Sequence, residues 1–321
     1  MGRLTLHPKH LVTGPAWLGG WRKDAPIPEE SVWLKNFVSP RTRQTYLNAV
    51  REFIGFHQIT DPEELRAIDQ VHVIAWRDFL IQSGASPKTI HNRISAVSST
   101  FKHLCEHQVA KRNPTVGVKR PHVDSSQVKT PVITPEQVRK MLDGPSSEKL
   151  QGLRDQAVLH ILFYTGCRIS EVCSLRVKDF YEDGGYFVLD FLVKGGKRNR
   201  LAIHQELQIV LKKYLEASGH ERNGESPLIL ATKKKSGRKA LTPLSRQQMH
   251  NLFMLYAKKA GLPQGVRPHT ARATFITQAL EKKCPIEAVQ RSVGHSRIST
   301  TQMYDKRTLK HRESASFAVV Y

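Results

Sequence analysis

The sequence has no long apolar run and few cysteines, and each absence excludes a class of protein. No stretch approaches the roughly 20 apolar residues of a membrane-spanning helix, so we expect a soluble protein. The N-terminus lacks the apolar core of a secretory signal, which favours cytoplasmic residence. The four cysteines form no CxxC pair and no Cys/His cluster at zinc spacing. We therefore expect no disulfide, no metal and no other cofactor.

Acidic residues are scarce relative to basic ones. The 321 residues include 28 Asp and Glu against 50 Lys and Arg, which leaves a formal net charge of +22. A field of this size is useful when a polyanion matches it, so DNA or RNA is the leading partner. The charge by itself leaves open a solvated basic surface or a ribosomal-type RNA binder.

Length and helix start signals predict two domains. A chain of 321 residues exceeds the usual size of one compact domain. Ser39-Pro40 and Ser86-Pro87 each place a capping hydroxyl before a proline, which begins a long helix. After Ser86, apolar residues recur at alternating spacings of four and three and line one helix face. Asp61-Pro62 opens a segment that predicts a turn or two short helices.

The chain is predicted to be mainly α. We expect an N-terminal extension at 1–27, an all-helical domain at 28–115, a linker at 116–133 and a second domain at 134–321. In the second domain, helices are predicted from Thr134-Pro135 and at 153–164, 205–217, 246–260 and 270–283, with strands at 186–193 and 200–204. A glycine-containing turn joins the strands into a hairpin, so this domain is α+β with a small antiparallel sheet.

Three segments of the second domain concentrate groups suited to a phosphodiester. They are TGCRISEVCSL at 165–175, HTAR at 269–272 and GHSRISTTQMY at 294–304. The guanidinium groups of Arg168 and Arg272 can bind phosphate oxygens bidentately and stabilise developing negative charge without a metal. Each motif is weak alone, because an arginine after a glycine-ended helix is commonly a surface ion-pair partner.

Taken together, the three segments resemble the Arg, His-x-x-Arg, Gly-His and Tyr motifs of the tyrosine recombinases. The residues that occur in that family's order are Arg168, Lys194, His269, Arg272, His295 and Tyr304. The resemblance spans nearly the whole chain from about residue 28. It implies a SAM-like core-binding domain followed by a catalytic domain. The implied activity is site-specific cleavage and religation of duplex DNA through a 3′-phosphotyrosine, without metal or ATP.

The resemblance also implies roles for the individual residues. Tyr304 is the nucleophile, since a phenol ester stores the energy of the cleaved bond for religation. His269 lies one helical turn before Arg272 and accepts the tyrosine proton or contacts the phosphate; a structural histidine is the alternative. His295 donates a hydrogen bond to a phosphate oxygen. Glu171 is expected to hold Arg168 by hydrogen bonding, with an ordinary exposed acid as the alternative.

A lysine in the hairpin turn is expected to protonate the leaving 5′-oxygen. Lys194 matches the family's lysine. The turn reads VKGGKRNR and carries one residue more than the commonest form, so Lys197 stays open as the acid.

Basic residues outside these motifs are candidates for contacts to the DNA backbone. They are Arg41, Arg43 and Lys88 at helix starts, Lys197 in the hairpin turn, and Lys233, Lys234, Lys235, Arg238 and Lys239 in one loop. A solvated charge run is the alternative for the loop. The resemblance suggests a homotetramer on two DNA sites, with the C-terminal tail docked on a neighbouring subunit or packed on its own. A catalytically inactive DNA-binding or architectural protein, or an RNA-binding protein, remains the competing function.

Overall fold

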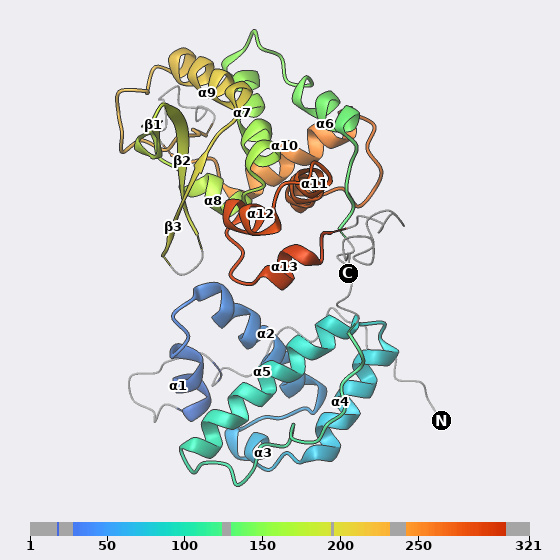
Figure 1. The fold of residues 1–321 in the computed structure, drawn as a ribbon. Coiled ribbons are helices and arrows are strands. Elements are labelled where there is room, and N and C mark those ends of the chain that lie inside the picture. The colour runs from blue at the N-terminus through green and yellow to red at the C-terminus, as the bar shows by residue number, and fades with distance from the viewer. Residues whose placement is uncertain (1–17, 19–27, 124–129, 194–195, 232–241, 306–321) are drawn as a thin grey trace, which may run out of the picture. The chain divides into compact units, whose positions relative to one another are not determined.

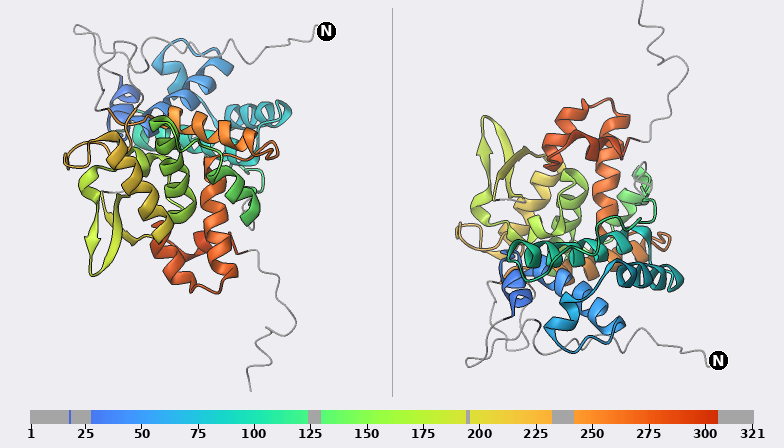
Figure 2. Two further views of the ribbon diagram at one scale, coloured as in Figure 1. Left: turned by 90° about the horizontal axis from the view of Figure 1, so that it is seen from above. Right: turned by 90° about the horizontal axis from the view of Figure 1, so that it is seen from below.

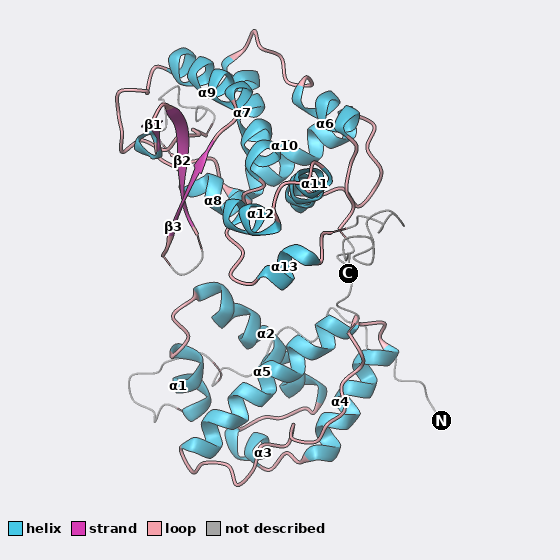
Figure 3. Cartoon of the chain, viewed as in Figure 1, coloured by secondary structure: helices cyan, strands magenta, loops and turns pink. Residues whose placement is uncertain are grey.

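The computed structural model describes residues 18, 28–123, 130–193, 196–231 and 242–305 (Figure 1). The chain divides into two compact units, residues 1–124 and 125–321, and this division falls inside the segment predicted as a linker. The individual domain bounds stay predictions. Among the described residues, strands occur in the second unit alone and helices dominate both units (Figure 3). The predicted fold class, mainly α with a small antiparallel sheet, is confirmed.

The first unit is all-helical in its described part. Its helices are α1 (Glu29–Lys35), α2 (Pro40–Phe56), α3 (Pro62–Arg66), α4 (Gln70–Gln82) and α5 (Pro87–Glu106). Ser39 and Ser86 cap α2 and α5 as predicted, because each hydroxyl accepts a hydrogen bond from an amide three residues on. Asp61 and Asp69 cap α3 and α4 in the same way.

The core of the first unit lies between α2 and α5. The residues predicted to line one face of the second of these helices are all buried: Ile90, Ile94, Val97, Phe101 and Leu104. Phe53 of α2 and Trp76 of α4 pack edge to face in the same cluster. Burying a side chain of this size contributes about 1.5–3 kcal/mol, so this face accounts for the position of α5.

The second unit is built around α7. Its elements are α6 (Pro135–Leu142), α7 (Leu150–Thr165), α8 (Ile169–Ser174), a 3-10 turn (Val177–Asp179), β1 (Phe180–Asp183), β2 (Tyr186–Leu192), β3 (Arg198–Ala202), α9 (Gln205–Ser218), α10 (Arg246–Lys259), α11 (Pro268–Glu281), α12 (Ile286–Val293) and α13 (Ile298–Gln302). Leu159, Ile161 and Leu162 of α7 are completely buried. Helices α6, α8, α9, α10 and α11 all contact α7, so it is the central helix of this unit.

The sheet has three antiparallel strands in the order β1-β2-β3 and lies at one edge of the helices of its unit (Figure 2). The hairpin of β2 and β3 was predicted, whereas β1 was not. Strand β1 has four residues and half of them are exposed, so it carries no apolar alternation. Gly184 and Gly185 both have positive φ angles, which is the backbone that a tight hairpin turn between β1 and β2 requires.

No helix in the described part of the chain is both long enough and apolar enough to cross a membrane.

Candidate active site

Two glycines end helices and direct the chain into one region of the second unit. Gly166 follows α7 and Gly294 follows α12, and both have left-handed φ angles, 61° and 64°. A Cβ atom at residue 166 would lie 2.6 Å from the Phe275 ring, so a side chain here would have to displace that ring. Arg168 comes two residues after the first glycine and His295 directly after the second.

Arg272 of α11 joins these two helix ends. Its Nη1 donates to the carbonyl oxygen of Gly166 at 2.8 Å, and its Nη2 donates to that of Val293 at 2.7 Å. Carbonyl groups at helix C-termini lack partners within the helix and carry partial negative charge, so a buried guanidinium suits them. The Arg272 side chain therefore holds the two helix ends together. Among the described residues, no carboxylate forms an ion pair with it.

The Arg272 guanidinium retains donors for a ligand. The residue is 1% exposed, and its Nε has no hydrogen-bond partner within the described ranges. Burial lowers the pKa of Arg272 to about 10, and repulsion from Arg168 adds to this effect. The side chain is still protonated at neutral pH. A buried cation with an unused donor is suited to receive an anion such as a phosphate oxygen.

Arg168 is held by Glu171, as the sequence predicts. Its Nη1 lies 2.7 Å from Oε1 of Glu171, and its own backbone N–H donates to Oε2 at 2.7 Å. The carboxylate side chain is 7% exposed, whereas the arginine side chain is 40% exposed. Glu171 therefore orients a guanidinium whose other donors remain open to solvent or to a ligand.

The phenol of Tyr304 is hydrogen-bonded to His269. Nε2 of His269 lies 3.0 Å from Oη of Tyr304, although 35 residues separate them. Burial, together with repulsion from Arg272 and Arg168, lowers the pKa of His269 below its usual value of 6.5. Burial raises the pKa of Tyr304, while the two arginines act in the opposite direction. At neutral pH the pair is thus a phenol and a neutral imidazole, which is the state in which a histidine can accept the phenolic proton.

His295 packs against the same tyrosine. Its ring is stacked on the Tyr304 ring with centroids 6.1 Å apart, and its Nδ1 lies 2.9 Å from the Thr301 hydroxyl. Burial lowers the pKa of His295 to about 3, with further repulsion from Arg272, Arg168 and His269. The imidazole is therefore neutral. When Thr301 donates to Nδ1, the ring proton is on Nε2 and is available to a phosphate oxygen.

The turn end of the β2–β3 hairpin is fastened to the end of α12. Asn199 of β3 donates from Nδ2 to the carbonyl of Ser292 at 3.0 Å. A Cβ atom at residue 294 would lie 3.3 Å from Cγ1 of Val193, so a glycine there allows the hairpin to approach. Lys194 lies outside the described residues. Lys197 is exposed, and its carbonyl accepts from the Val193 amide at 2.8 Å.

The structure brings together five of the six residues of the family pattern. Arg168, His269, Arg272, His295 and Tyr304 are linked through shared hydrogen bonds, ring stacking and electrostatic interaction. Lys194, the sixth, lies outside the described residues. Asn199 was missed by sequence reasoning, because no local pattern marks an asparagine whose partner is 93 residues away.

The residues predicted to contact DNA differ in the hydrogen bonds that they form within the protein. Arg41 and Lys88 are exposed at the starts of α2 and α5. Arg43 donates from Nη2 to the carbonyls of Phe37 and Lys35, at 2.7 and 3.3 Å, so part of its bonding capacity stabilises the turn before α2. The loop candidates Lys233, Lys234, Lys235, Arg238 and Lys239 lie outside the described residues. Their contacts to DNA stay predictions.

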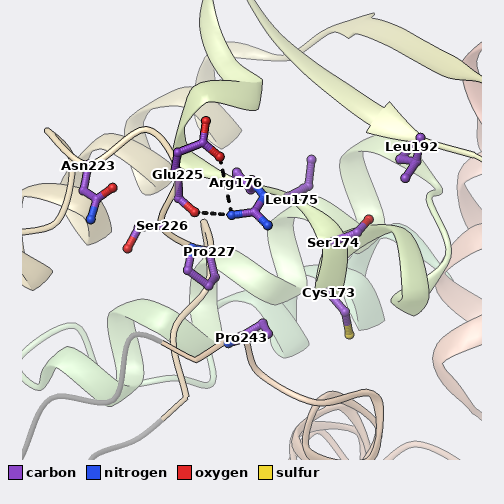
Figure 4. Close-up of a pocket in the computed structure, with 10 residues that line it drawn as sticks. All are labelled: Cys173, Ser174, Leu175, Arg176, Leu192, Asn223, Glu225, Ser226, Pro227 and Pro243. Atoms are coloured by element: carbon purple, nitrogen blue, oxygen red, sulfur yellow. Dashed lines mark hydrogen bonds and ion pairs between the residues drawn. The ribbon is translucent and has the colours of Figure 1, made fainter.

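A hollow of about 550 Å³ elsewhere on the second unit contains none of these residues (Figure 4). It is lined by residues that include Cys173, Arg176, Glu225 and Pro243. Arg176 points toward Glu225 and donates to its carbonyl oxygen, and its guanidinium also lies near the carboxylate of the same residue. The positive charge in this hollow is therefore already balanced, which makes it a poor phosphate site.

The residues around Tyr304 define a class of protein. A tyrosine bonded to a neutral histidine, beside two arginines and within a helical domain that carries a small sheet, is the site of a tyrosine-type recombinase. Residues 131–311 match the phage integrase family, and residues 35–111 match the phage integrase N-terminal SAM-like domain. The chain belongs to the phage integrase family and is a tyrosine-type site-specific recombinase. The family and the enzyme class predicted from the motifs are confirmed.

Relatives match over most of the chain. Tyrosine recombinase XerD of Listeria monocytogenes is 28% identical over 275 residues, which cover 83% of this chain and 88% of the relative. Tyrosine recombinase XerC of Thermodesulfovibrio yellowstonii is 30% identical over 282 residues, covering 85% and 88%.

Solved structures agree with the fold. XerH bound to a palindromic difH substrate has a TM-score of 0.71 at 18% identity, and the match covers 91% of this chain and 85% of that one. The Tn1549 transposon integrase in complex with transposon right end DNA has a TM-score of 0.69 at 18% identity, covering 88% and 94%.

Proposed function

We propose that this protein cleaves and religates duplex DNA at specific sites through a 3′-phosphotyrosine at Tyr304, without metal or ATP. The observation that carries the proposal is the 3.0 Å contact between Nε2 of His269 and Oη of Tyr304, beside the buried Arg272. A nucleophile, a base in the correct protonation state and a cation are thereby held in one place.

In the proposed reaction, Oη of Tyr304 attacks the phosphorus as its proton passes to His269. The bond from phosphorus to the 5′-oxygen breaks, and the hairpin lysine, Lys194 or Lys197, protonates that oxygen. Arg168, Arg272 and His295 stabilise the charge on the nonbridging oxygens. Attack by a 5′-hydroxyl on the tyrosyl ester reverses these steps, so no energy source is needed.

The same proposal includes the partners. XerH has been solved bound to difH, and a lambda integrase tetramer has been solved bound to a Holliday junction, at 18% and 17% identity to this chain. By analogy, we propose that double-stranded DNA is the substrate and that four copies assemble on two sites in the cytoplasm. Docking of the tail after Tyr304 on a neighbouring copy belongs to this proposal, and residues 306–321 lie outside the described ranges.

A catalytically inactive DNA-binding protein is the competing function. Such a protein would use the net charge of +22 but has no need for a phenol hydrogen-bonded to a neutral imidazole. The arrangement of His269, Arg272 and Tyr304 therefore favours the enzyme.

The decisive experiment uses a nicked suicide substrate, from which the cleaved strand end is lost so that religation stops. The full-length protein is incubated with it in EDTA, and covalent adducts are counted on a denaturing gel. We expect adducts with the unaltered protein and none with Tyr304→Phe. Tyr186→Phe is the matched control, because Tyr186 is 68% exposed on β2, and it should form adducts normally. Target DNA is sought first in the sequences that flank the gene.

Two results would contradict the proposal. Adducts that persist in Tyr304→Phe would place the nucleophile elsewhere, and adducts that appear only with added magnesium would require metal chemistry.

A further inference from the structure

Two histidines lie at the C-terminal end of α5, far along the sequence from the residues of the active site. His103 is in the last turn of the helix, and His107, four residues on, is the residue that caps it. Their ring centroids are 4.2 Å apart. Glu29 lies in the first turn of α1, and its carboxylate contacts His103 where α1 packs against α5.

The three side chains point their ligand atoms at one another. Oε2 of Glu29 lies 3.0 Å from Nε2 of His103 and 3.9 Å from Nδ1 of His107. One ligand atom from each of the three residues lies within 4.8 Å of the other two. Bonds of about 2.0–2.2 Å from zinc to nitrogen and oxygen place neighbouring ligands of a tetrahedral ion roughly 3.4 Å apart. The two separations from Oε2 of Glu29, 3.0 and 3.9 Å, lie on either side of that value.

A hydrogen bond accounts for only part of this arrangement. His103 is within hydrogen-bond distance of Glu29, whereas His107 at 3.9 Å is not. The two rings are tilted by 35° to each other, and each turns one nitrogen toward the same carboxylate oxygen. A single cation between the three atoms would satisfy all of them with both imidazoles neutral.

We propose that Glu29, His103 and His107 bind one divalent transition-metal ion, with zinc as the probe. Two imidazole nitrogens and one carboxylate oxygen suit zinc, nickel, copper or cobalt, whereas magnesium and calcium prefer oxygen ligands throughout. The side chain of His103 is 12% exposed and that of His107 is 50% exposed. The ion can therefore enter from solvent, and water completes its coordination.

The ion would stabilise the attachment of α1 to α5. Helix α1 has seven residues and no side-chain hydrogen bond at its N-cap, so it depends on tertiary contacts. Two such contacts are the ion pair between Glu30 and Arg66 and the hydrogen bond from Trp33 to Ser99. A metal would strengthen the contact that Glu29 already makes with His103, at the first turn. The site lies in the first unit and performs no phosphoryl transfer, so it does not depend on the proposed function.

The test is zinc binding by the full-length protein after removal of metals with EDTA and dialysis. Calorimetric titration with zinc chloride should show a site that binds one ion per chain with a micromolar dissociation constant. Zinc in about hundredfold excess over that constant should raise the Tm by about 5 °C, and the same concentration of magnesium should not.

Variants separate this site from other metal-binding groups. His103→Gln, His107→Gln and Glu29→Gln should each weaken zinc binding at least tenfold. His107→Gln changes the most exposed ligand and carries little risk to folding. His122→Gln is the matched control, because His122 is an exposed histidine of the same unit outside the cluster, and it should bind zinc normally. Cobalt(II) should give the visible absorption of a low-symmetry site with the unaltered protein and lose it in His107→Gln.

The proposal is overturned if the three variants bind zinc as tightly as the unaltered protein, or if no site tighter than millimolar is found. Adduct formation in EDTA tests the phosphotyrosine chemistry separately, so failure of one proposal leaves the other standing.

Discussion

Arg272 combines two tasks in one side chain. Its guanidinium binds the carbonyls that end α7 and α12, and its position beside Tyr304 makes it a phosphate ligand in the proposed reaction. The planar fork of an arginine can reach two carbonyls at once, whereas the compact ammonium of a lysine cannot. A conservative replacement should therefore affect both stability and chemistry.

We predict that Arg272→Lys lowers the free energy of unfolding by about 2–4 kcal/mol, since it leaves buried carbonyls without a donor. Urea denaturation measures the change. Arg168→Lys is the control, because the Arg168 side chain is 40% exposed, and it should cost about 1 kcal/mol or less. If Arg272→Lys were as stable as the unaltered protein, the two hydrogen bonds from Arg272 to the carbonyl oxygens would make no net contribution to the free energy of unfolding.

The histidine pKa values predict a pH dependence of stability. The folded pKa of His295 is about 3, while an unfolded histidine titrates near 6.5. Between these values the unfolded state binds the additional proton, so stability must fall as the pH is lowered from about 7 toward 3. One such group contributes a slope of up to about 1.4 kcal/mol per pH unit. His269 acts in the same direction.

Unfolding free energies measured by urea at several pH values should therefore have a shallower acid slope in His295→Gln than in the unaltered protein. Identical slopes would mean that His295 is protonated in the folded state or that other groups dominate.

At the scale of elements, helix ends and one hairpin organise the site. Helices α7 and α12 both end at left-handed glycines, and the hairpin of β2 and β3 rests on the second of them. The bond from Asn199 to Ser292 holds β3 against α12 next to His295. The turn end of the hairpin is thereby held next to the proposed phosphate site.

We predict that Asn199→Ala slows cleavage of an ordinary DNA substrate about tenfold, because the hairpin lysine proposed to protonate the leaving oxygen would be less well placed. A substrate with sulfur at the 5′-bridging position needs no proton on its leaving group. Single-turnover cleavage of this substrate should be nearly normal in Asn199→Ala. The same rescue is expected in whichever of Lys194→Ala and Lys197→Ala lacks the acid, and the other variant should cleave both substrates normally. A defect of equal size on both substrates would assign Asn199 to general stability instead.

At the scale of the whole molecule, charge determines how the chain meets its substrate. A formal net charge of +22 is distributed over two compact units, which each have a hydrophobic core of their own. Neutralising DNA phosphates releases counterions, so affinity must fall as salt concentration rises.

The logarithm of the association constant should fall linearly with the logarithm of salt concentration, with a slope of about 0.9 for each phosphate contacted. Fluorescence anisotropy with the Tyr304→Phe variant measures binding without cleavage. Replacing Lys233, Lys234, Lys235, Arg238 and Lys239 by Gln should reduce the slope. An unchanged slope would remove this loop from the DNA contacts and support the alternative of a solvated charge run.

Several helices and contacts of this protein can be predicted from its sequence, because they depend on residues a few positions apart. Ser39 and Ser86 cap helices through amides three residues away, and the apolar stripe of α5 follows the helical period. Glu171 reaches Arg168 for the same reason, since one turn separates them. The ordered motifs and the excess of basic residues predict the family and a nucleic-acid partner.

Other features depend on segments that only the tertiary structure brings together. The partners of Arg272 lie 106 and 21 residues away, and Tyr304 meets His269 across 35 residues. Strand β1 is ordered by pairing with β2 rather than by its own residues. Glu29 meets His103 across 74 positions. Spacing along the chain records which residues share a helix face, but the packing of separate elements decides which side chains touch. The motifs thus predicted Tyr304 and left His269 open between its base and a phosphate contact, whereas the bond between the two and the dual task of Arg272 required the fold.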